Sequence, residues 1–202
     1  GSAFIHYSTD YVFDGKKGSP YVETDPTSPL GVYGQTKLEG ERLAEQAGGA
    51  ALVFRTSWVY STRRDSFVTK VLQWSRSQPQ LRMVTDQVGC PTWSRMLAEM
   101  TAQVLARAGQ DPVAYLRERR GLYHLASSGH ASRLAWAESI LQYDPHPEEQ
   151  TARKILPALT ADFPTPAERP LFSALDCGKF EDVFGIRIPP WQESLRLAME
   201  PE

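Results

Sequence analysis

The sequence predicts an α/β fold with a parallel sheet, and three observations support this prediction. Residues 4–7 and residues 50–60 form nearly continuous apolar runs, which are typical of strands buried on both faces. A helical pattern over residues 33–46 separates the two runs. A strand, a helix and a second strand in this order form a right-handed crossover between parallel strands.

The first expected strand leads directly into Ser8-Thr9-Asp10. In open α/β sheets ligands bind at the carboxyl ends of the strands, so these polar residues are candidates for a functional site. Residues 14–29 are rich in glycine and proline and predict a loop. The helix that follows this loop is expected to end at Gly48-Gly49.

The rest of the chain alternates helical and strand patterns. We expect an irregular loop over residues 85–93 and a helix over residues 95–108 that is capped by Ser94. Proline punctuates residues 144–169, so the strand expected near residue 155 belongs at a sheet edge. The other expected elements are helices over 66–75, 132–143, 177–184 and 191–199 and strands over 81–84 and 121–126.

Composition and charge exclude several classes of function. The chain has 202 residues, is 41% hydrophobic and carries a net charge of −2, so nothing indicates a nucleic-acid partner. No apolar run approaches the roughly 18 residues that span a membrane, and we expect a cytoplasmic protein. Cys90 and Cys177 are isolated, and the histidines lack ligand spacing with them, so neither a disulfide framework nor a zinc-type metal site is expected.

The most informative pair is Tyr33 and Lys37, four residues apart on the expected helix and therefore on one face. A nearby ammonium lowers the pKa of a phenol from its usual value of about 10, which suits proton transfer at neutral pH. The competing interpretation is a buried tyrosine and a solvated lysine on an ordinary amphipathic helix. Further residues must therefore decide between the two.

Those further residues come from two strand ends. Thr9 follows the first expected strand, and Arg55-Thr56-Ser57-Trp58 ends the second, so both belong at the same sheet edge as Tyr33 and Lys37. A hydroxyl, a phenol and an ammonium near one point can polarise and protonate a carbonyl group.

In four segments the chain resembles the dTDP-4-dehydrorhamnose reductases, which are extended short-chain dehydrogenase/reductases. The resemblance extends over essentially the whole chain. The segments are Ser8-Thr9-Asp10-Tyr11-Val12-Phe13-Asp14-Gly15, Pro29-Leu30-Gly31-Val32-Tyr33-Gly34-Gln35-Thr36-Lys37-Leu38-Glu39-Gly40-Glu41, Arg55-Thr56-Ser57-Trp58-Val59-Tyr60 and Asp86-Gln87-Val88-Gly89-Cys90-Pro91-Thr92.

This resemblance implies reduction of the C4 ketone of dTDP-4-dehydro-L-rhamnose with NADPH or NADH as cofactor. It implies that Tyr33 protonates the developing alkoxide and that Lys37 binds the nicotinamide ribose. It also implies that Thr9 hydrogen-bonds the ketone oxygen and that Asp10 and Trp58 contact the dTDP-sugar substrate. An oxyanion needs preorganised donors, and an indole offers a sugar ring an apolar face.

The same residues also have structural interpretations. Thr9 suits a turn, Asp10 suits a cap, and Trp58 suits the core. We expect Arg55 to pair with a structural carboxylate and Cys90 to serve packing, whereas Arg169 suits either a diphosphate or the anchoring of its loop. Gln87 and Thr92 are equally suited to reaching the ligand and to supporting their loop.

The family's Gly-rich turn after its first strand has no counterpart in this chain. We therefore expect an incomplete Rossmann-type parallel sheet, with the N-terminal βαβ units missing, and a small α+β substrate-binding lobe. Residues 1–62 and 95–126 are assigned to the Rossmann-type domain, and residues 63–94 and 127–202 to the lobe. The chain is expected to be inactive alone, and its open sheet edge favours a homo-oligomer.

Two alternatives come from related proteins. A nucleotide-sugar dehydratase or epimerase is one, although dehydratases place a glutamate after Thr-Asp where this chain has Tyr11. A non-catalytic regulatory subunit, like that of methionine adenosyltransferase, is the other. The carboxylates of the family's metal-bridged dimer are not expected here, because Trp93-Ser94-Arg95 follow Pro91-Thr92.

Overall fold

The computed structural model describes residues 2–200 and contains a three-stranded parallel sheet with the strand order β1-β2-β7. The strands are β1 (Ala3–Thr9), β2 (Ala50–Thr56) and β7 (Gly121–His124). Thr9 pairs in register with Thr56, so β1 and β2 end at the same edge of the sheet. The predicted α/β fold with parallel strands is confirmed.

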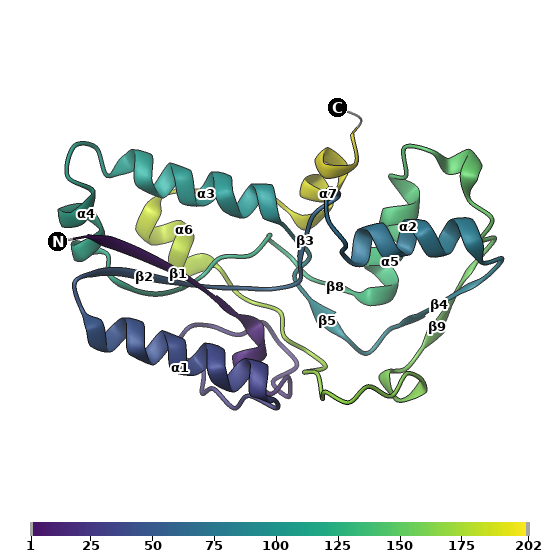
Figure 1. The fold of residues 1–202 in the computed structure, drawn as a ribbon, viewed down its shortest axis with the longest axis horizontal. Coiled ribbons are helices and arrows are strands. Elements are labelled where there is room, and N and C mark those ends of the chain that lie inside the picture. Colours follow the sequence, from purple (N-terminus) through teal and green to yellow (C-terminus); the bar gives the residue numbers. More distant parts are fainter. Residues whose placement is uncertain (1, 201–202) are drawn as a thin grey trace.

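Helices cover both faces of this sheet (Figure 1). Helix α1 (Val32–Ala47) lies on one face, and α3 (Ser94–Arg107), α4 (Pro112–Glu118) and α6 (Gly178–Phe184) lie on the other. The core between the sheet and helices α3, α4 and α6 contains Leu52, Phe54, Met100, Val104, Leu116, Phe180 and Phe184. Every residue of β2 is buried, which explains the apolar run over residues 50–54.

A second group of elements packs beside the sheet, at the right of Figure 1. It contains α2 (Phe67–Ser77), α5 (Arg133–Gln142) and the parallel strands β4 (Leu81–Val84) and β9 (Ile155–Ala158). Helix α7 (Trp191–Met199) completes its core, which is centred on Trp136, Val68, Val71, Ile140 and Leu195. Pro157 lies in β9, which has one partner strand, as expected of a proline at a sheet edge.

Short strands occupy the region expected to be irregular. The segment 85–93 contains β5 (Val88–Gly89) and β6 (Thr92–Trp93), which pair with β8 (Ala131–Ser132) and β3 (Val59–Tyr60) respectively. Three single turns of 3-10 helix complete the fold: η1 (Asp10–Val12), η2 (Pro147–Glu149) and η3 (Thr160–Asp162).

The first residues of helices α5 and α3 can be compared with the starts expected from the sequence. The helix expected over residues 132–143 begins at Arg133, and Ser132 caps it, because its hydroxyl accepts a hydrogen bond of 3.1 Å from the backbone N–H of Ala135. The prediction that Ser94 caps α3 is wrong, because the helix begins at Ser94 itself. Trp93 ends β6 and stands at the cap position in an extended conformation, so the helix starts one residue earlier than expected.

Helix α6 packs into the core of the sheet through Phe180 and Phe184, although it lies within residues 127–202. The assignment of that range to a separate lobe stays a prediction. A smaller buried cluster joins η1 to distant loops and includes Val12, Phe13, Tyr21, Cys90 and Ala174. In residues 2–200 no helix combines the length and apolar character that a membrane span requires.

Candidate active site

Thr9 and Asp10 lie where β1 passes into η1, and both side chains are buried. The Thr9 hydroxyl donates a hydrogen bond of 3.1 Å to Asp10 Oδ1 and accepts one of 3.2 Å from the backbone N–H of Tyr11. Thr9 therefore caps η1, which is the turn-forming role considered from the sequence. The same hydroxyl lies at the carboxyl edge of the sheet.

Asp10 is 2% exposed, and its carboxylate accepts hydrogen bonds from three hydroxyl groups. Besides Thr9, Ser57 donates to Oδ2 at 2.8 Å and Ser173 donates to Oδ2 at 2.5 Å. Ser57 also accepts a bond of 3.2 Å from the backbone N–H of Cys90. Burial raises the pKa of the Asp10 carboxyl, and the three hydroxyl donors oppose that rise.

Tyr33 and Lys37 lie in the first turns of α1, on the side next to β1. Tyr33 is 57% exposed, and its ring meets the Tyr11 ring edge-on at a centroid distance of 5.9 Å. The Lys37 ammonium donates a hydrogen bond to the backbone oxygen of Tyr7 near the end of β1. Because Tyr33 is exposed, the interpretation as a buried core tyrosine does not apply.

Gly34 allows the start of α1 to lie against η1. A Cβ atom at this position would stand 2.2 Å from the backbone oxygen of Tyr11 and 2.8 Å from Cβ of Pro29. Real Cβ atoms do not approach that closely, so a larger residue would separate α1 from η1. The glycine between Tyr33 and Lys37 therefore sets how near the pair lies to Thr9.

Two groups contact the indole of Trp58, which follows the end of β2. Its indole stacks on Trp136 with centroids 5.6 Å apart, and the Arg133 guanidinium lies 3.5 Å from the centre of the Trp58 ring. The backbone φ of Trp58 is +43°, an uncommon value for a bulky residue. Gly89 makes room for the ring, because a Cβ there would lie 2.5 Å from it.

A cavity of about 470 Å³ is lined by four cations and three aromatic rings, and one of these cations, Arg133, lies over the Trp58 ring. Burial raises the pKa of Tyr11, whose ring contacts Tyr33, and two of these cations, Arg133 and Arg169, oppose that rise. Burial, together with the nearby charge of Arg169, lowers the pKa of Arg133 to about 10. The remaining charged and aromatic lining residues are Lys70, Arg82, Phe67, Trp74 and Phe163.

Sequence reasoning considered Arg169 but missed Arg133 and Tyr11. A signal for Arg133 was present, because it follows the Ser132 cap and so occupies the first turn of α5. A cation is unfavourable at a helix N-terminus, so an arginine there needs another reason. Tyr11 was noted only as a replacement for glutamate, yet it contacts the Tyr33 ring and feels the charges of Asp10, Arg133 and Arg169.

Two expectations of structural roles are confirmed. Arg55 forms a buried bidentate ion pair with Glu41 of α1, with bonds of 2.9 and 2.7 Å. Cys90 is fully buried, its sulfur accepts a bond of 3.3 Å from the Leu175 N–H, and burial raises its pKa to about 12. That thiol therefore stays protonated and packs.

Thr92 and Gln87 take different positions. Thr92 is fully buried and its hydroxyl donates to the Cys90 backbone oxygen at 2.9 Å, so it supports the loop. Gln87 lines the cavity and donates to the Thr160 hydroxyl at 3.1 Å.

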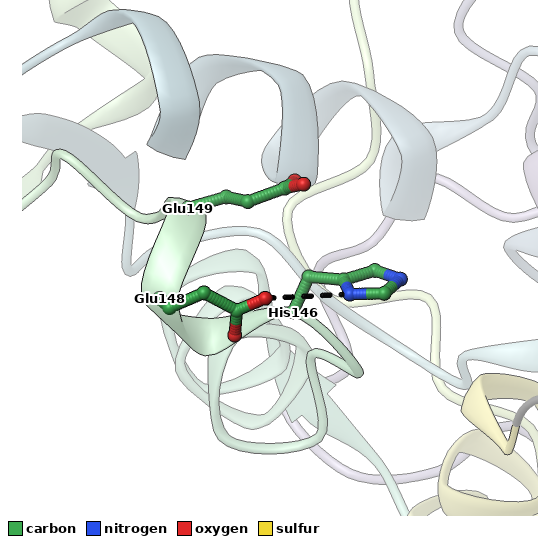
Figure 2. Close-up of side chains that lie close together, drawn as sticks. All are labelled: His146, Glu148 and Glu149. Carbon is green, nitrogen blue, oxygen red and sulfur yellow. Dashed lines mark ion pairs between the residues drawn. The ribbon is translucent and has the colours of Figure 1, made fainter.

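The one group of potential metal ligands found in residues 2–200 comprises His146, Glu148 and Glu149, whose ligand atoms lie within 4.8 Å of one another. All three side chains are exposed, and Figure 2 shows His146 facing Glu148, with 3.5 Å between Nδ1 and Oε1. Glu149 already pairs with Arg76 at 2.5 Å. Arginine and histidine can thus compensate these carboxylates, and the group carries no argument for a metal.

The arrangement suits protonation of a carbonyl oxygen next to an anion-binding cavity. Tyr33 offers an accessible phenol, Lys37 supplies a positive charge one helical turn away, and Thr9 adds a hydroxyl at the sheet edge. Arg133 and Arg169 provide two guanidinium groups for an anion, and guanidinium geometry matches phosphate.

Comparison with known proteins identifies the family. The sequence model of the RmlD substrate binding domain matches residues 1–202. The dTDP-4-dehydrorhamnose reductase of Burkholderia thailandensis is 39% identical over 98% of this chain and 67% of its own length.

Two solved structures extend the comparison. The Clostridium acetobutylicum dTDP-4-dehydrorhamnose reductase superposes with a TM-score of 0.86 at 30% identity, over 98% of this chain and 65% of its own. The Bacillus anthracis enzyme, solved in complex with NADP, gives a TM-score of 0.82 at 26% identity, over 97% and 64%.

The chain thus spans about two thirds of the length of the relatives that it matches. Similarity at this level over nearly the whole chain, with a family model that matches from end to end, shows common descent rather than a shared fold alone. This chain belongs to the RmlD substrate binding domain family, whose relatives include the dTDP-4-dehydrorhamnose reductases.

Proposed function

We propose that this chain supplies the proton-donating and substrate-binding side of a dTDP-4-dehydrorhamnose reductase. The reaction is the reduction of the C4 ketone of dTDP-4-dehydro-L-rhamnose to dTDP-L-rhamnose. The observation that carries the proposal is the exposed Tyr33, with Lys37 one turn further along α1, at the sheet edge where Thr9 ends β1. The relatives named for this activity support it.

In this proposal Tyr33 gives its phenolic proton to the C4 oxygen as negative charge develops there. The Thr9 hydroxyl donates a hydrogen bond to the same oxygen and so stabilises the oxyanion. The positive charge of Lys37 stabilises the phenolate that remains after the proton has left. The Tyr33 hydroxyl then regains a proton from solvent, since its ring is more than half exposed.

The cofactor is NADPH or NADH, which supplies a hydride to C4 when bound. Tyr33 and Lys37 are the residues of this chain that suit the nicotinamide ribose, because both lie in the first turns of α1 with their side chains at least partly exposed. The complex of the Bacillus anthracis relative with NADP supports NADPH. Between β1 and α1 the chain has η1 and a long loop instead of a Gly-rich turn.

The dTDP-sugar is placed across Trp58 and the cation-lined cavity. Arg133 and Arg169 hold the diphosphate, and the indole of Trp58 lies against the sugar. Asp10 acts through Thr9, whose hydroxyl group donates to it, because its own carboxylate is buried among hydroxyl groups. Self-association is also part of the proposal, since Phe4 and Tyr7 of β1 are exposed and no described strand pairs with its outer edge.

Replacement of Tyr33 by Phe tests the proposal on the longest natural form of the protein. We expect Tyr33→Phe to lower kcat for dTDP-sugar-dependent NADPH oxidation by about 100-fold or more, because it removes the proton donor and keeps the ring. The KM for the sugar nucleotide should change little. Tyr143→Phe is the matched control, because that ring lies at the end of α5 in the second group of elements.

Other outcomes would favour the alternatives. Unchanged kcat in Tyr33→Phe would contradict the assignment of the proton donor. A wild-type protein that oxidises no NADPH but binds another protein tightly would favour the regulatory subunit. Release of water from a dTDP-hexose would indicate a dehydratase, a class for which Tyr11 stands where a glutamate is expected.

A further inference from the structure

The hydroxyl group of Thr9 has one proton, and that proton is already used. Thr9 Oγ1 donates to Asp10 Oδ1 at 3.1 Å, while one of its lone pairs accepts from the Tyr11 N–H. A hydroxyl has one donor and two acceptor sites, so only an acceptor site remains free. A ketone oxygen needs a donor, and in this arrangement Thr9 cannot provide one.

We propose that Asp10 is a positioning residue that competes with the substrate ketone for the hydroxyl proton of Thr9. This inference rests on the proposed reductase function and adds a condition to it. Thr9 serves the ketone only when its hydrogen bond to Asp10 is given up, so the strength with which Asp10 holds that proton sets the contribution of Thr9.

The surroundings of Asp10 favour such an exchange. Ser57 and Ser173 both donate to Oδ2, at 2.8 and 2.5 Å, so the carboxylate keeps two donors when Thr9 turns away. The bond to Thr9 is also the longest of the three. In the described part of the chain no lysine or arginine forms an ion pair with Asp10.

The charged and titratable groups that face Asp10 come from three elements. Tyr11 lies in η1, Cys90 lies in the loop between β5 and β6, and Arg133 begins α5. Burial raises the pKa of Tyr11 and raises that of Cys90 to about 12, so both are neutral at neutral pH. Arg133 is therefore the permanent charge that acts on the carboxylate.

Protonation of Asp10 weakens its hold on Thr9, because a neutral carboxyl is a poorer acceptor than a carboxylate. Burial raises the pKa of Asp10 and so extends the range over which the neutral form is present. The contribution of Thr9 to catalysis is expected to be greatest at low pH and to fall as Asp10 ionises.

The Asp10→Asn variant separates the two states of Thr9. An amide offers its single oxygen to Ser57 and Ser173 and turns its NH₂ group towards Thr9, as a donor. Thr9 then accepts from the amide, and its own proton is free for the ketone at any pH. Thr9→Val removes the hydroxyl in either background.

The experiment measures the pH profiles of kcat and KM for NADPH oxidation on the longest natural form, in a cycle of the two variants. In the Asp10→Asn background we expect Thr9→Val to lower kcat by about 100-fold across the whole profile, as when an oxyanion donor is removed. In the wild-type background the loss should be only about 10-fold at the alkaline end of the profile and should grow towards its acidic end. Asp182→Asn on the exposed face of α6 is the matched control.

Equal losses from Thr9→Val in the two backgrounds at the alkaline end of the pH profile would overturn the competition. If Asp10→Asn does not fold, Ser173→Ala gives a second measurement. At the alkaline end of the pH profile, where the carboxylate is ionised, removal of that donor makes the carboxylate hold Thr9 more strongly, so kcat should fall there while KM stays the same. An unchanged kcat in that range would contradict the inference.

Failure of the reductase proposal looks different. In that case the wild-type protein shows no ketone-dependent NADPH oxidation, and Tyr33→Phe has no effect.

Discussion

His124 ends β7 with no solvent exposure, and its protonation state is fixed by its partners. Its Nδ1 lies 3.1 Å from the backbone oxygens of Tyr21 and Asp176, and since both are acceptors this nitrogen must carry the proton. Burial, together with the charge of Arg55, lowers the pKa of His124 to about 3. The folded protein therefore holds a neutral histidine that the unfolded chain would protonate in mild acid.

The free energy of unfolding is expected to decrease as the pH falls from about 6.5 towards about 3. In this range His124 binds a proton in the unfolded chain but stays neutral in the folded protein. One proton changes stability by about 1.4 kcal/mol per pH unit, so acidification to pH 5 removes about 2 kcal/mol. Urea unfolding at pH 7 and pH 5 measures this. In His124→Asn, whose amide nitrogen replaces Nδ1, this part of the pH dependence should vanish.

Exposed His146 provides the comparison, and His146→Asn should keep the full pH dependence of the wild type. A wild type and a His124→Asn variant with the same change in stability between pH 7 and pH 5 would show that His124 is not the group responsible.

Some site residues were predictable one by one, and others were not. Tyr33, Lys37 and Thr9 follow from local patterns, because helix periodicity and the end of a strand fix where they point. The surroundings of Asp10 depend on Ser173, which is 163 residues away in the sequence. No local pattern reports such a contact, so the burial of this carboxylate became visible only in the folded chain.

At the scale of elements, α1 is joined to the sheet by a buried ion pair. Arg55 of β2 donates two hydrogen bonds to Glu41 of α1, and Ser8 of β1 donates a third. The pair holds the helix that carries Tyr33 and Lys37 in register with the two strands. Each charged group is almost completely excluded from water, so water does not replace a lost partner.

Glu41→Gln should destabilise the protein by about 3–5 kcal/mol, because it leaves the Arg55 charge buried without a counterion. Glu39→Gln removes the exposed partner of Arg42 on the same helix, and its cost should stay below about 1 kcal/mol. Chemical denaturation followed by circular dichroism compares the two. Equal losses would mean that water reaches the buried pair.

The longer elements were predicted well because a short stretch of sequence contains the signal for each of them. Either the hydrogen bonds form within that stretch, as in a helix, or its apolar residues recur with the period of the element. The helices over residues 66–75 and 132–143 and the strands over 81–84 and 121–126 appear close to their expected bounds. Strands β5 and β6 were missed, since each has two residues and is defined by partners elsewhere in the chain. Helix α4 was also missed, although Asp111 before Pro112 is a typical helix start.

At the scale of the whole molecule, the described residues supply more of the proposed proton-donating and substrate-binding groups than of the cofactor-binding groups. The cation-lined cavity, Trp58 and the Tyr33–Lys37 pair lie within the described residues. The three-stranded sheet has an open edge along β1, and no strand within residues 2–200 leads through a Gly-rich turn into a helix N-terminus. Such a turn is the usual pyrophosphate-binding element of dinucleotide-binding sheets.

We therefore expect the isolated 202-residue chain to bind dTDP but to bind NADPH too weakly for turnover. The cavity with Arg133 and Arg169 provides charge for the diphosphate of dTDP, whereas Tyr33 and Lys37 reach only one end of a dinucleotide. Isothermal titration calorimetry of this chain with each ligand measures both affinities. Micromolar binding of NADPH would contradict the prediction. Loss of dTDP binding in Arg133→Gln, against no loss in Arg187→Gln on the exposed surface, would show that the cavity is the nucleotide site.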